Sequence, residues 1–129
     1  MLTPGLTHTS TLTVTTAHTA VALGSGDLSV LATPAMLALM ENAAMLAVAP
    51  ELPHDSTTVG GHISSSHLKP SPIGSTVEAT ATLTEVKGRK LTFSLSARQT
   101  SNPDGTPCDQ LIGEGSHLRF VVNREAFIP

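Results

Sequence analysis

The chain has 129 residues, which is the size of one domain with room for a hydrophobic core. Its formal net charge is −3 and only 13% of its residues are charged, so it lacks the clustered Lys and Arg of a nucleic-acid-binding surface. With three Phe, no Trp and no Tyr, it also offers few stacking platforms for single-stranded nucleic acid.

Other sequence features favour a cytoplasmic protein. The single cysteine, Cys108, excludes an intramolecular disulfide and a Cys-rich metal cage. The N-terminal residues MLTPGLTHTS lack the basic and apolar regions of a secretory signal. The longest apolar run, residues 34–49, contains Glu41 and is shorter than the roughly 20 residues of a membrane-spanning helix. We therefore expect a soluble, cytoplasmic protein that does not enter membranes.

The first half of the chain predicts a strand followed by a long helix. Residues 6–24 are rich in Thr and begin with alternating apolar and polar positions, which is typical of a strand. After a connector, Thr33-Pro34 is a strong helix start, with Thr as N-cap and Pro at the first helical position. Helix-forming residues continue until Pro50. The expected helix has about 16 residues, and its apolar character all round indicates that other structure encloses it.

The second half predicts four strands, within residues 57–70, 75–86, 90–98 and 109–122. The middle two alternate cleanly about a short turn, which predicts an antiparallel hairpin. Its expected inward-facing residues are Val77, Ala79, Ala81, Leu83, Leu91, Phe93, Leu95 and Ala97. Two glycines in the last strand indicate a bulge or a close backbone approach. We expect one α+β domain, residues 1–129, in which a curled antiparallel sheet surrounds one long central helix. One side of this layer needs a partner, so a homodimer or a higher oligomer is expected.

Three motifs carry a resemblance to a known family. They are TPAMLALMENAA with Thr33 and Glu41, VGGHISSSHLKPSPIG with His67, and IGEGSHLRF with His117 and Arg119. In this order they resemble the fluoroacetyl-CoA thioesterase family, and the order of elements is that of the hot-dog fold. The resemblance runs from about residue 30 to the C-terminus. It implies an acyl-CoA thioesterase whose catalytic residues are Glu41, His67 and Thr33, with coenzyme A as part of the substrate and neither a metal nor a separate cofactor.

One stretch departs from the family. The specialised member has bulky aromatic residues just before the helix, in a lid thought to favour its fluorinated substrate. Here the sequence reads GSGDLSVLA, residues 24–32, without any aromatic residue. The resemblance therefore implies thioesterase activity on a small acyl-CoA but not fluoroacetyl specificity.

Glu41 is the strongest chemical clue, because its neighbours one helical turn away are apolar. A carboxylate buried there must be paired, protonated or catalytic. In thioester hydrolysis it attacks the acyl carbonyl as a nucleophile or activates water as a general base, and the sequence leaves both routes open. His67, with a pKa near neutrality, would orient Glu41 or protonate the leaving thiolate.

Thr33 has a complete structural explanation as an N-cap, so its catalytic role rests on the resemblance alone. Eight helical residues place it roughly 12 Å from Glu41. If both residues serve one site, the substrate spans that distance or a partner subunit supplies one of them. We therefore expect the site at a dimer interface.

The remaining candidates are substrate-binding residues. Gly60 and Gly61 either relieve a bend or let an acyl group approach bare backbone N–H groups. His117 and Arg119 share a strand face and either lie at the surface or contact coenzyme A phosphates or the subunit interface. From a different functional class, the alternative is a protein that binds or senses acyl-CoA without hydrolysing it.

Overall fold

The computed structural model describes residues 1–128 and confirms the predicted order of strand, long helix and four strands. The main elements are β1 (Thr7–Thr13), α2 (Thr33–Val48), β2 (Ser56–His67), β3 (Thr76–Lys87), β4 (Lys90–Ser101) and β5 (Pro107–Asn123). Four short elements accompany them: η1 (Thr16–His18), α1 (Ala20–Leu23), η2 (Ala49–Glu51) and α3 (Arg124–Phe127).

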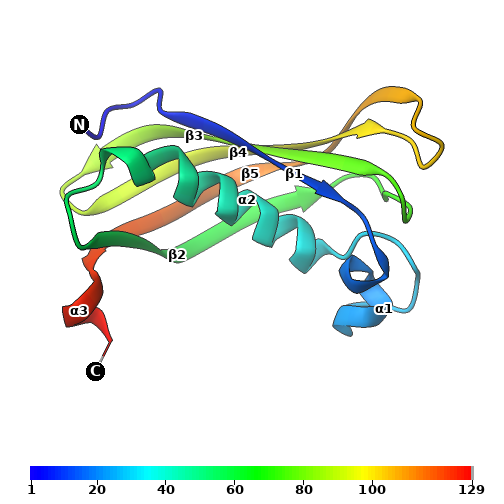
Figure 1. Ribbon diagram of the computed structural model, residues 1–129, viewed down its shortest axis with the longest axis horizontal. Helices are drawn as coiled ribbons and strands as arrows, with labels where there is room; N and C mark the ends of the chain where they lie inside the picture. Colours follow the sequence, from blue (N-terminus) through cyan, green and yellow to red (C-terminus); the bar gives the residue numbers. More distant parts are fainter. Residues whose placement is uncertain (129) are drawn as a thin grey trace.

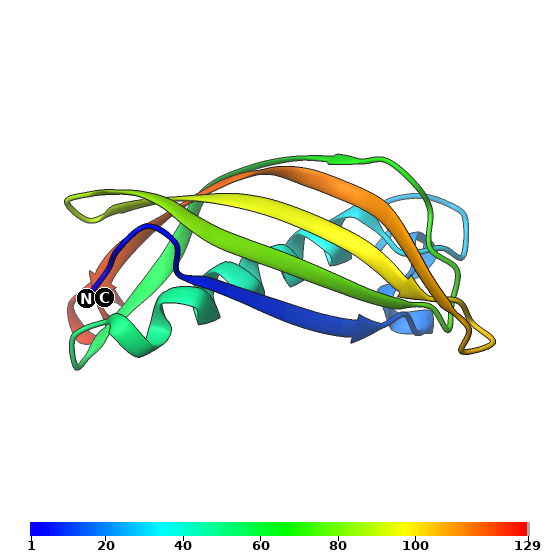
Figure 2. The ribbon, with the colours of Figure 1, turned by 90° about the horizontal axis from the view of Figure 1, so that it is seen from above.

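The five strands form one antiparallel sheet in the order β1-β3-β4-β5-β2. The sheet curves, and α2 lies along its concave face (Figures 1 and 2). Strand β2 is at one edge of the sheet, beside β5 only. Its outer edge therefore has backbone N–H and C=O groups without a neighbouring strand among residues 1–128.

The hydrophobic core lies between α2 and the alternate residues of the β3–β4 hairpin. The eight inward-facing positions predicted from the alternation are all buried: Val77, Ala79, Ala81, Leu83, Leu91, Phe93, Leu95 and Ala97. Gly88 turns the chain between the two strands with a φ of 61°, a left-handed conformation that glycine adopts without steric cost. The predicted hairpin and its inward face are confirmed.

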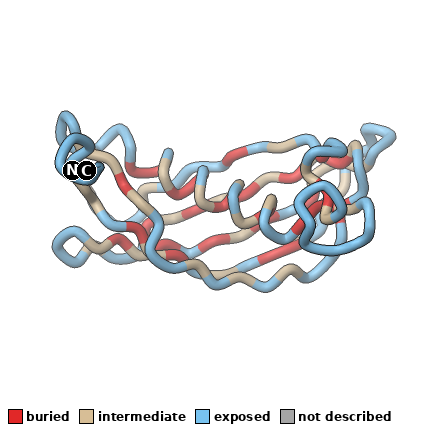
Figure 3. Tube along the Cα trace, turned by 90° about the horizontal axis from the view of Figure 1, so that it is seen from below, coloured by how far each residue is buried: buried red, intermediate tan, exposed pale blue. Residues whose placement is uncertain are grey.

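Helix α2 has the predicted length of 16 residues, but one chain does not enclose it. Met36, Met40 and Ala44 are among its buried residues. Ala38 and Leu46, in contrast, are exposed, and the exposed turns are visible in Figure 3. The expectation of an enclosed helix is therefore wrong for the single chain, because the sheet covers only one side of it.

The start of α2 also differs from the prediction. Ala32 is the N-cap residue and provides no side-chain cap, while Thr33 is the first helical residue. The hydroxyl of Thr33 is instead hydrogen-bonded to the ring of His67. Thr33 is thus not an N-cap, and its side chain points toward another element.

The first predicted strand is too long. Strand β1 ends at Thr13, and the chain then forms η1 and α1 before the connector. Thr19 caps α1 by accepting a hydrogen bond from the backbone N–H of Ala22, and Gly24 ends that helix with a φ of 70°. These local capping interactions compete with the β-propensity of a Thr-rich segment.

The two glycines of β5 permit a close backbone approach, as expected. A Cβ atom on Gly115 would lie 1.9 Å from the carbonyl oxygen of Ser64 on β2. A Cβ on Gly113 would lie 2.7 Å from the sulfur of Met36 on α2. Strand β5 can therefore be in close contact with both β2 and the helix.

None of the helices within residues 1–128 is long and apolar enough to cross a membrane.

The packing of the core predicts that truncating two phenylalanines changes the free energy of unfolding by very different amounts. Phe93 is fully buried, whereas Phe127 is 55% exposed. Phe93→Ala should lower the free energy of unfolding by about 3–5 kcal/mol, because it removes buried apolar surface and leaves a cavity. Phe127→Ala is the matched control and should change it by less than about 1 kcal/mol. Urea unfolding followed by circular dichroism measures both values, and equal effects of the two substitutions would contradict this description of the core.

Candidate active site

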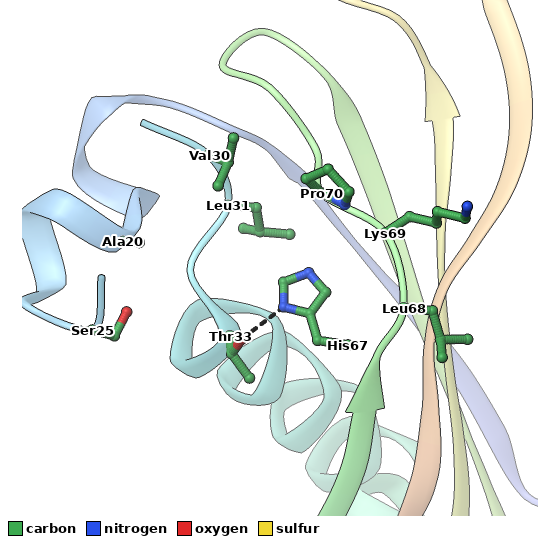
Figure 4. Close-up of a pocket in the computed structure, with 9 residues that line it drawn as sticks. All are labelled: Ala20, Ser25, Val30, Leu31, Thr33, His67, Leu68, Lys69 and Pro70. Carbon is green, nitrogen blue, oxygen red and sulfur yellow. Dashed lines mark hydrogen bonds between the residues drawn. The ribbon is translucent and has the colours of Figure 1, made fainter. Parts of the chain in front are cut away.

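Two of the predicted catalytic residues meet at the start of α2. The Thr33 hydroxyl oxygen lies 2.7 Å from Nδ1 of His67, the last residue of β2 (Figure 4). The contact joins residues 34 positions apart in the sequence. The sheet curvature brings the end of β2 over the first turn of the helix, so the fold itself creates this pair.

A cleft of about 270 Å³ lies beside the Thr33–His67 pair. One wall comes from the segment before α2 and the other from the loop after β2. Its lining residues are Ala20, Ser25, Val30, Leu31, Thr33, His67, Leu68, Lys69 and Pro70. In Figure 4 the imidazole of His67 points toward Thr33, whereas the Lys69 side chain extends away from that pair. The cleft therefore combines a mostly aliphatic lining with one hydroxyl–imidazole pair.

The second ring nitrogen of His67, Nε2, is buried and has no hydrogen-bond partner among residues 1–128. Burial lowers the pKa of His67 because it disfavours the charged imidazolium, and the nearby backbone of Lys69 opposes this shift. His67 therefore favours the neutral form, with one ring nitrogen that donates and one that accepts. If the Thr33 hydroxyl donates to Nδ1, Nε2 carries the proton.

Glu41 lies in the middle of α2, against Gly60 of β2. A Cβ atom on Gly60 would be 2.7 Å from the carboxylate oxygen Oε2. Gly60 thus leaves the space that the carboxylate occupies. The Glu41 side chain is 43% exposed in the single chain, so the expectation of a buried carboxylate is not met without a partner.

Glu41 also faces a buried guanidinium. Nη1 of Arg119, on β5, lies 3.8 Å from Oε2 of Glu41. Arg119 donates from Nε to the Thr58 hydroxyl at 2.8 Å and from Nη2 to the Thr58 carbonyl oxygen at 2.9 Å. The pKa of Arg119 is lowered by burial, and the charge of Glu41 opposes the shift.

His117 completes this buried polar group. Its Nε2 lies 3.3 Å from Nη1 of Arg119, and its Nδ1 lies 2.7 Å from the carbonyl oxygen of His62. Because an Arg N–H can only donate, Nε2 must accept and Nδ1 must carry the proton. Burial is the main cause of the lowered pKa of His117, and the charge of Arg119 lowers it further. His117 is therefore neutral, with both ring nitrogens occupied within the chain.

The surface position considered for His117 and Arg119 is contradicted, since only 1% and 6% of these residues are exposed. Thr58, which holds Arg119, was not identified from the sequence. The only signal for it was its position two residues before Gly60, on the same face of the strand. Gly61 accommodates the ring of Phe120, which would lie 2.4 Å from a Cβ at that position. Substrate contacts of these residues stay predictions.

The predicted site residues thus form two separate groups in one chain. Thr33 and His67 lie at one end of α2, and Glu41 with Gly60 and Arg119 lies near its middle. The expected contact between His67 and Glu41 is absent from the hydrogen bonds and ion pairs of residues 1–128. The same residues contain no group of three or more His, Cys, Asp or Glu side chains that could hold a metal ion.

A known family matches most of this sequence. The family model described as fluoroacetyl-CoA-specific thioesterase matches residues 14–125. The fluoroacetyl-CoA thioesterase of Streptantibioticus cattleyicolor is 40% identical over 98 residues, which are 76% of this chain and 65% of that relative. The matched region therefore spans slightly less than two thirds of the relative's own length.

Solved structures agree on the fold. A mutant of the fluoroacetyl-CoA-specific thioesterase FlK, in complex with fluoroacetate and CoA, is 31% identical and has a TM-score of 0.83, covering 98% of this chain and 99% of that one. A hot-dog-like protein from Thermanaerovibrio acidaminovorans is 22% identical and has a TM-score of 0.78, covering 96% of this chain and 86% of that one. The predicted hot-dog fold is confirmed.

The buried His117 and the partly buried His67 predict a stability that decreases in acid. The pKa values of His67 and His117 are both lowered in the folded chain, whereas a histidine in the unfolded chain titrates near pH 6.5. Below about pH 6.5 the unfolded chain binds more protons, so the free energy of unfolding should fall as the pH decreases and level off below the folded pKa values. Thermal unfolding at about pH 7.5 and about pH 5.5 measures this change, and NMR titration of the imidazole signals assigns it. Imidazole signals of His67 and His117 that titrate above pH 6.5 would contradict it.

Proposed function

We propose that this chain, which belongs to the fluoroacetyl-CoA-specific thioesterase family, hydrolyses a small acyl-CoA thioester to the free acid and coenzyme A. The observation that carries the proposal is the hydrogen-bonded Thr33–His67 pair beside a mostly aliphatic cleft. A family member binds fluoroacetate and CoA, the acid and thiol parts of such a substrate. Glu41 supplies the carboxylate that thioester hydrolysis needs.

A complete site requires a second copy of the chain. Thr33 and Glu41 are separated by about 12 Å along a rigid helix, and Gly60 and His67 by roughly 23 Å along β2. Within the described part of the chain, strand β2 pairs with β5 alone, so its outer edge is unpaired. Antiparallel pairing of two β2 strands, centred between Ile63 and Ser64, reverses their directions and brings Gly60 of one copy to the level of His67 of the other. Each site of the proposed homodimer then combines Thr33 and His67 from one chain with Glu41 from its partner.

The proposed chemistry divides the work between the two groups. Glu41 activates a water molecule that adds to the thioester carbonyl carbon, or it attacks that carbon itself and water then opens the anhydride. In both routes the carbon–sulfur bond breaks and the thiolate of coenzyme A leaves. The leaving sulfur takes up the proton that the attacking water loses, while His67, held by Thr33 through Nδ1, stays neutral and orients the reacting groups. Gly60 leaves room for the Glu41 carboxylate and Gly61 for the Phe120 ring, so any substrate contact of these two residues is made by their backbone.

The segment before the helix bears on the choice of substrate. Residues 24–32 contain no aromatic side chain, and this segment contributes aliphatic residues such as Val30 and Leu31 to the cleft. We propose that the protein accepts small acyl groups without a preference for the fluorinated one, since no bulky ring closes over this end of the cleft.

The first prediction concerns turnover. The wild-type protein should release free thiol from at least one member of a panel of short acyl-CoA thioesters. Glu41→Gln should reduce kcat at least about a hundredfold, because the amide can neither attack nor accept a proton. Glu114→Gln, at an exposed position of β5, is the control and should retain wild-type activity. Binding of acyl-CoA by calorimetry without thiol release would instead support the non-catalytic sensor.

The second prediction tests the shared site. His67→Ala and Glu41→Gln should each be inactive alone, since each destroys both sites of its homodimer. After subunit exchange, half of the dimers contain one copy of each variant and one intact site. Mixed samples should therefore regain about a quarter of wild-type activity. Each site lies within one chain if the mixture stays inactive although mass spectrometry detects the mixed dimer.

A further inference from the structure

We propose that Thr58 is a positioning residue: it holds the guanidinium of Arg119 in the orientation that faces Glu41 while leaving the carboxylate free to react. This inference rests on the proposed function for its kinetic meaning. Its structural part, the locked guanidinium, is measurable without turnover.

The positive charge of Arg119 is buried. Arg119 is 6% exposed, and a buried guanidinium is stable only if hydrogen bonds and an opposite charge compensate for the lost water. Thr58 provides two of these acceptors, its hydroxyl oxygen to Nε and its carbonyl oxygen to Nη2. His117 provides a third acceptor, its Nε2 to Nη1. The three contacts fix the plane of the guanidinium.

The register of β2 and β5 places Thr58 beside Arg119. Gly60 pairs with Arg119, and Thr58 pairs with Val121, so Thr58 is the diagonal neighbour of Arg119 on the same face of the sheet. Because Gly60 has no side chain, the guanidinium lies alongside it, and a Cβ there would be 3.5 Å from Nη1. The Arg119 side chain therefore extends along β2 from Thr58 toward Glu41.

The guanidinium of Arg119 does not touch the Glu41 carboxylate closely. At 3.8 Å, the contact between Nη1 and Oε2 of Glu41 is an ion pair without a hydrogen bond. The charge of Arg119 attracts the carboxylate to this place, but no residue within 1–128 donates a hydrogen bond to Glu41. A guanidinium released from Thr58 could turn and form a bidentate pair with Glu41, which would occupy both carboxylate oxygens. Thr58 prevents this by engaging Nε and Nη2.

The test compares three substitutions on β2. Thr58→Val has nearly the same shape but removes the hydroxyl acceptor, whereas Thr58→Ser keeps it. Thr57→Val makes the same chemical change at the adjacent residue, which faces the opposite side of the strand. Thr58→Ala replaces the valine variant if the latter does not fold.

The kinetic expectation is specific to positioning. Thr58→Val should lower kcat at least about tenfold with KM within about threefold, because it disturbs the reacting carboxylate rather than uniform substrate binding. Thr58→Ser should restore kcat to within about threefold of wild type, and Thr57→Val should leave it unchanged. An unchanged kcat in Thr58→Val, or an equal loss in Thr57→Val, would overturn the inference.

The structural expectation separates this inference from the proposed function. In the wild-type protein the Nε–H of Arg119 should give a distinct, slowly exchanging NMR signal, and Thr58→Val should shift it and speed its exchange. If the wild type does not hydrolyse any acyl-CoA but this signal behaves as expected, the proposed function fails and the positioning role stands. A rapidly exchanging Nε–H in the wild type, or a signal that Thr58→Val does not change, overturns the positioning role whatever the activity.

Discussion

The rigidity of helix α2 governs the arrangement of the whole site. A helix rises about 1.5 Å per residue, so the eight residues from Thr33 to Glu41 hold these side chains roughly 12 Å apart. The sheet curves around only one side of the helix, and the edge strand β2 lies along the helix. His67 therefore meets Thr33 at one end, while Gly60 meets Glu41 near the middle. No local rearrangement of side chains can close this distance within one chain.

The second organising feature is the buried polar group between β2 and β5. Arg119, His117 and Thr58 satisfy one another within the sheet, and Glu41 faces them from the helix. Low exposure strengthens these interactions, and it also makes each of them necessary, because an unpaired buried charge is costly. Within this group, Nη1 of Arg119 is the atom that faces the Glu41 carboxylate. The positive charge of Arg119 thus attracts this carboxylate, and neither Arg119 nor Thr58 needs to touch a substrate to have this effect.

Several features were predictable because short-range rules decide them. The alternation of Val77 to Leu83 and of Leu91 to Ala97 fixed the core face of the hairpin, since residues two apart share one side of a strand. Thr33 was harder. Its position before Pro34 fits an N-cap equally well, and only the contact with His67 explains the different role of its hydroxyl. The only local signal for Thr58 was its position two residues before Gly60, because its partner Arg119 lies 61 residues away.

The sequence by itself determined the order of the five strands and the long helix and the buried face of the β3–β4 hairpin, because periodicity and turn residues act over a few neighbouring positions. It also indicated Glu41 as unusual, since a carboxylate among apolar neighbours needs a reason. Only the tertiary structure decided which polar groups meet. Strand register and sheet curvature place His67 on Thr33, and Arg119 between Thr58 and Glu41. These contacts join distant segments, and their geometry depends on the packing of the whole sheet against the helix.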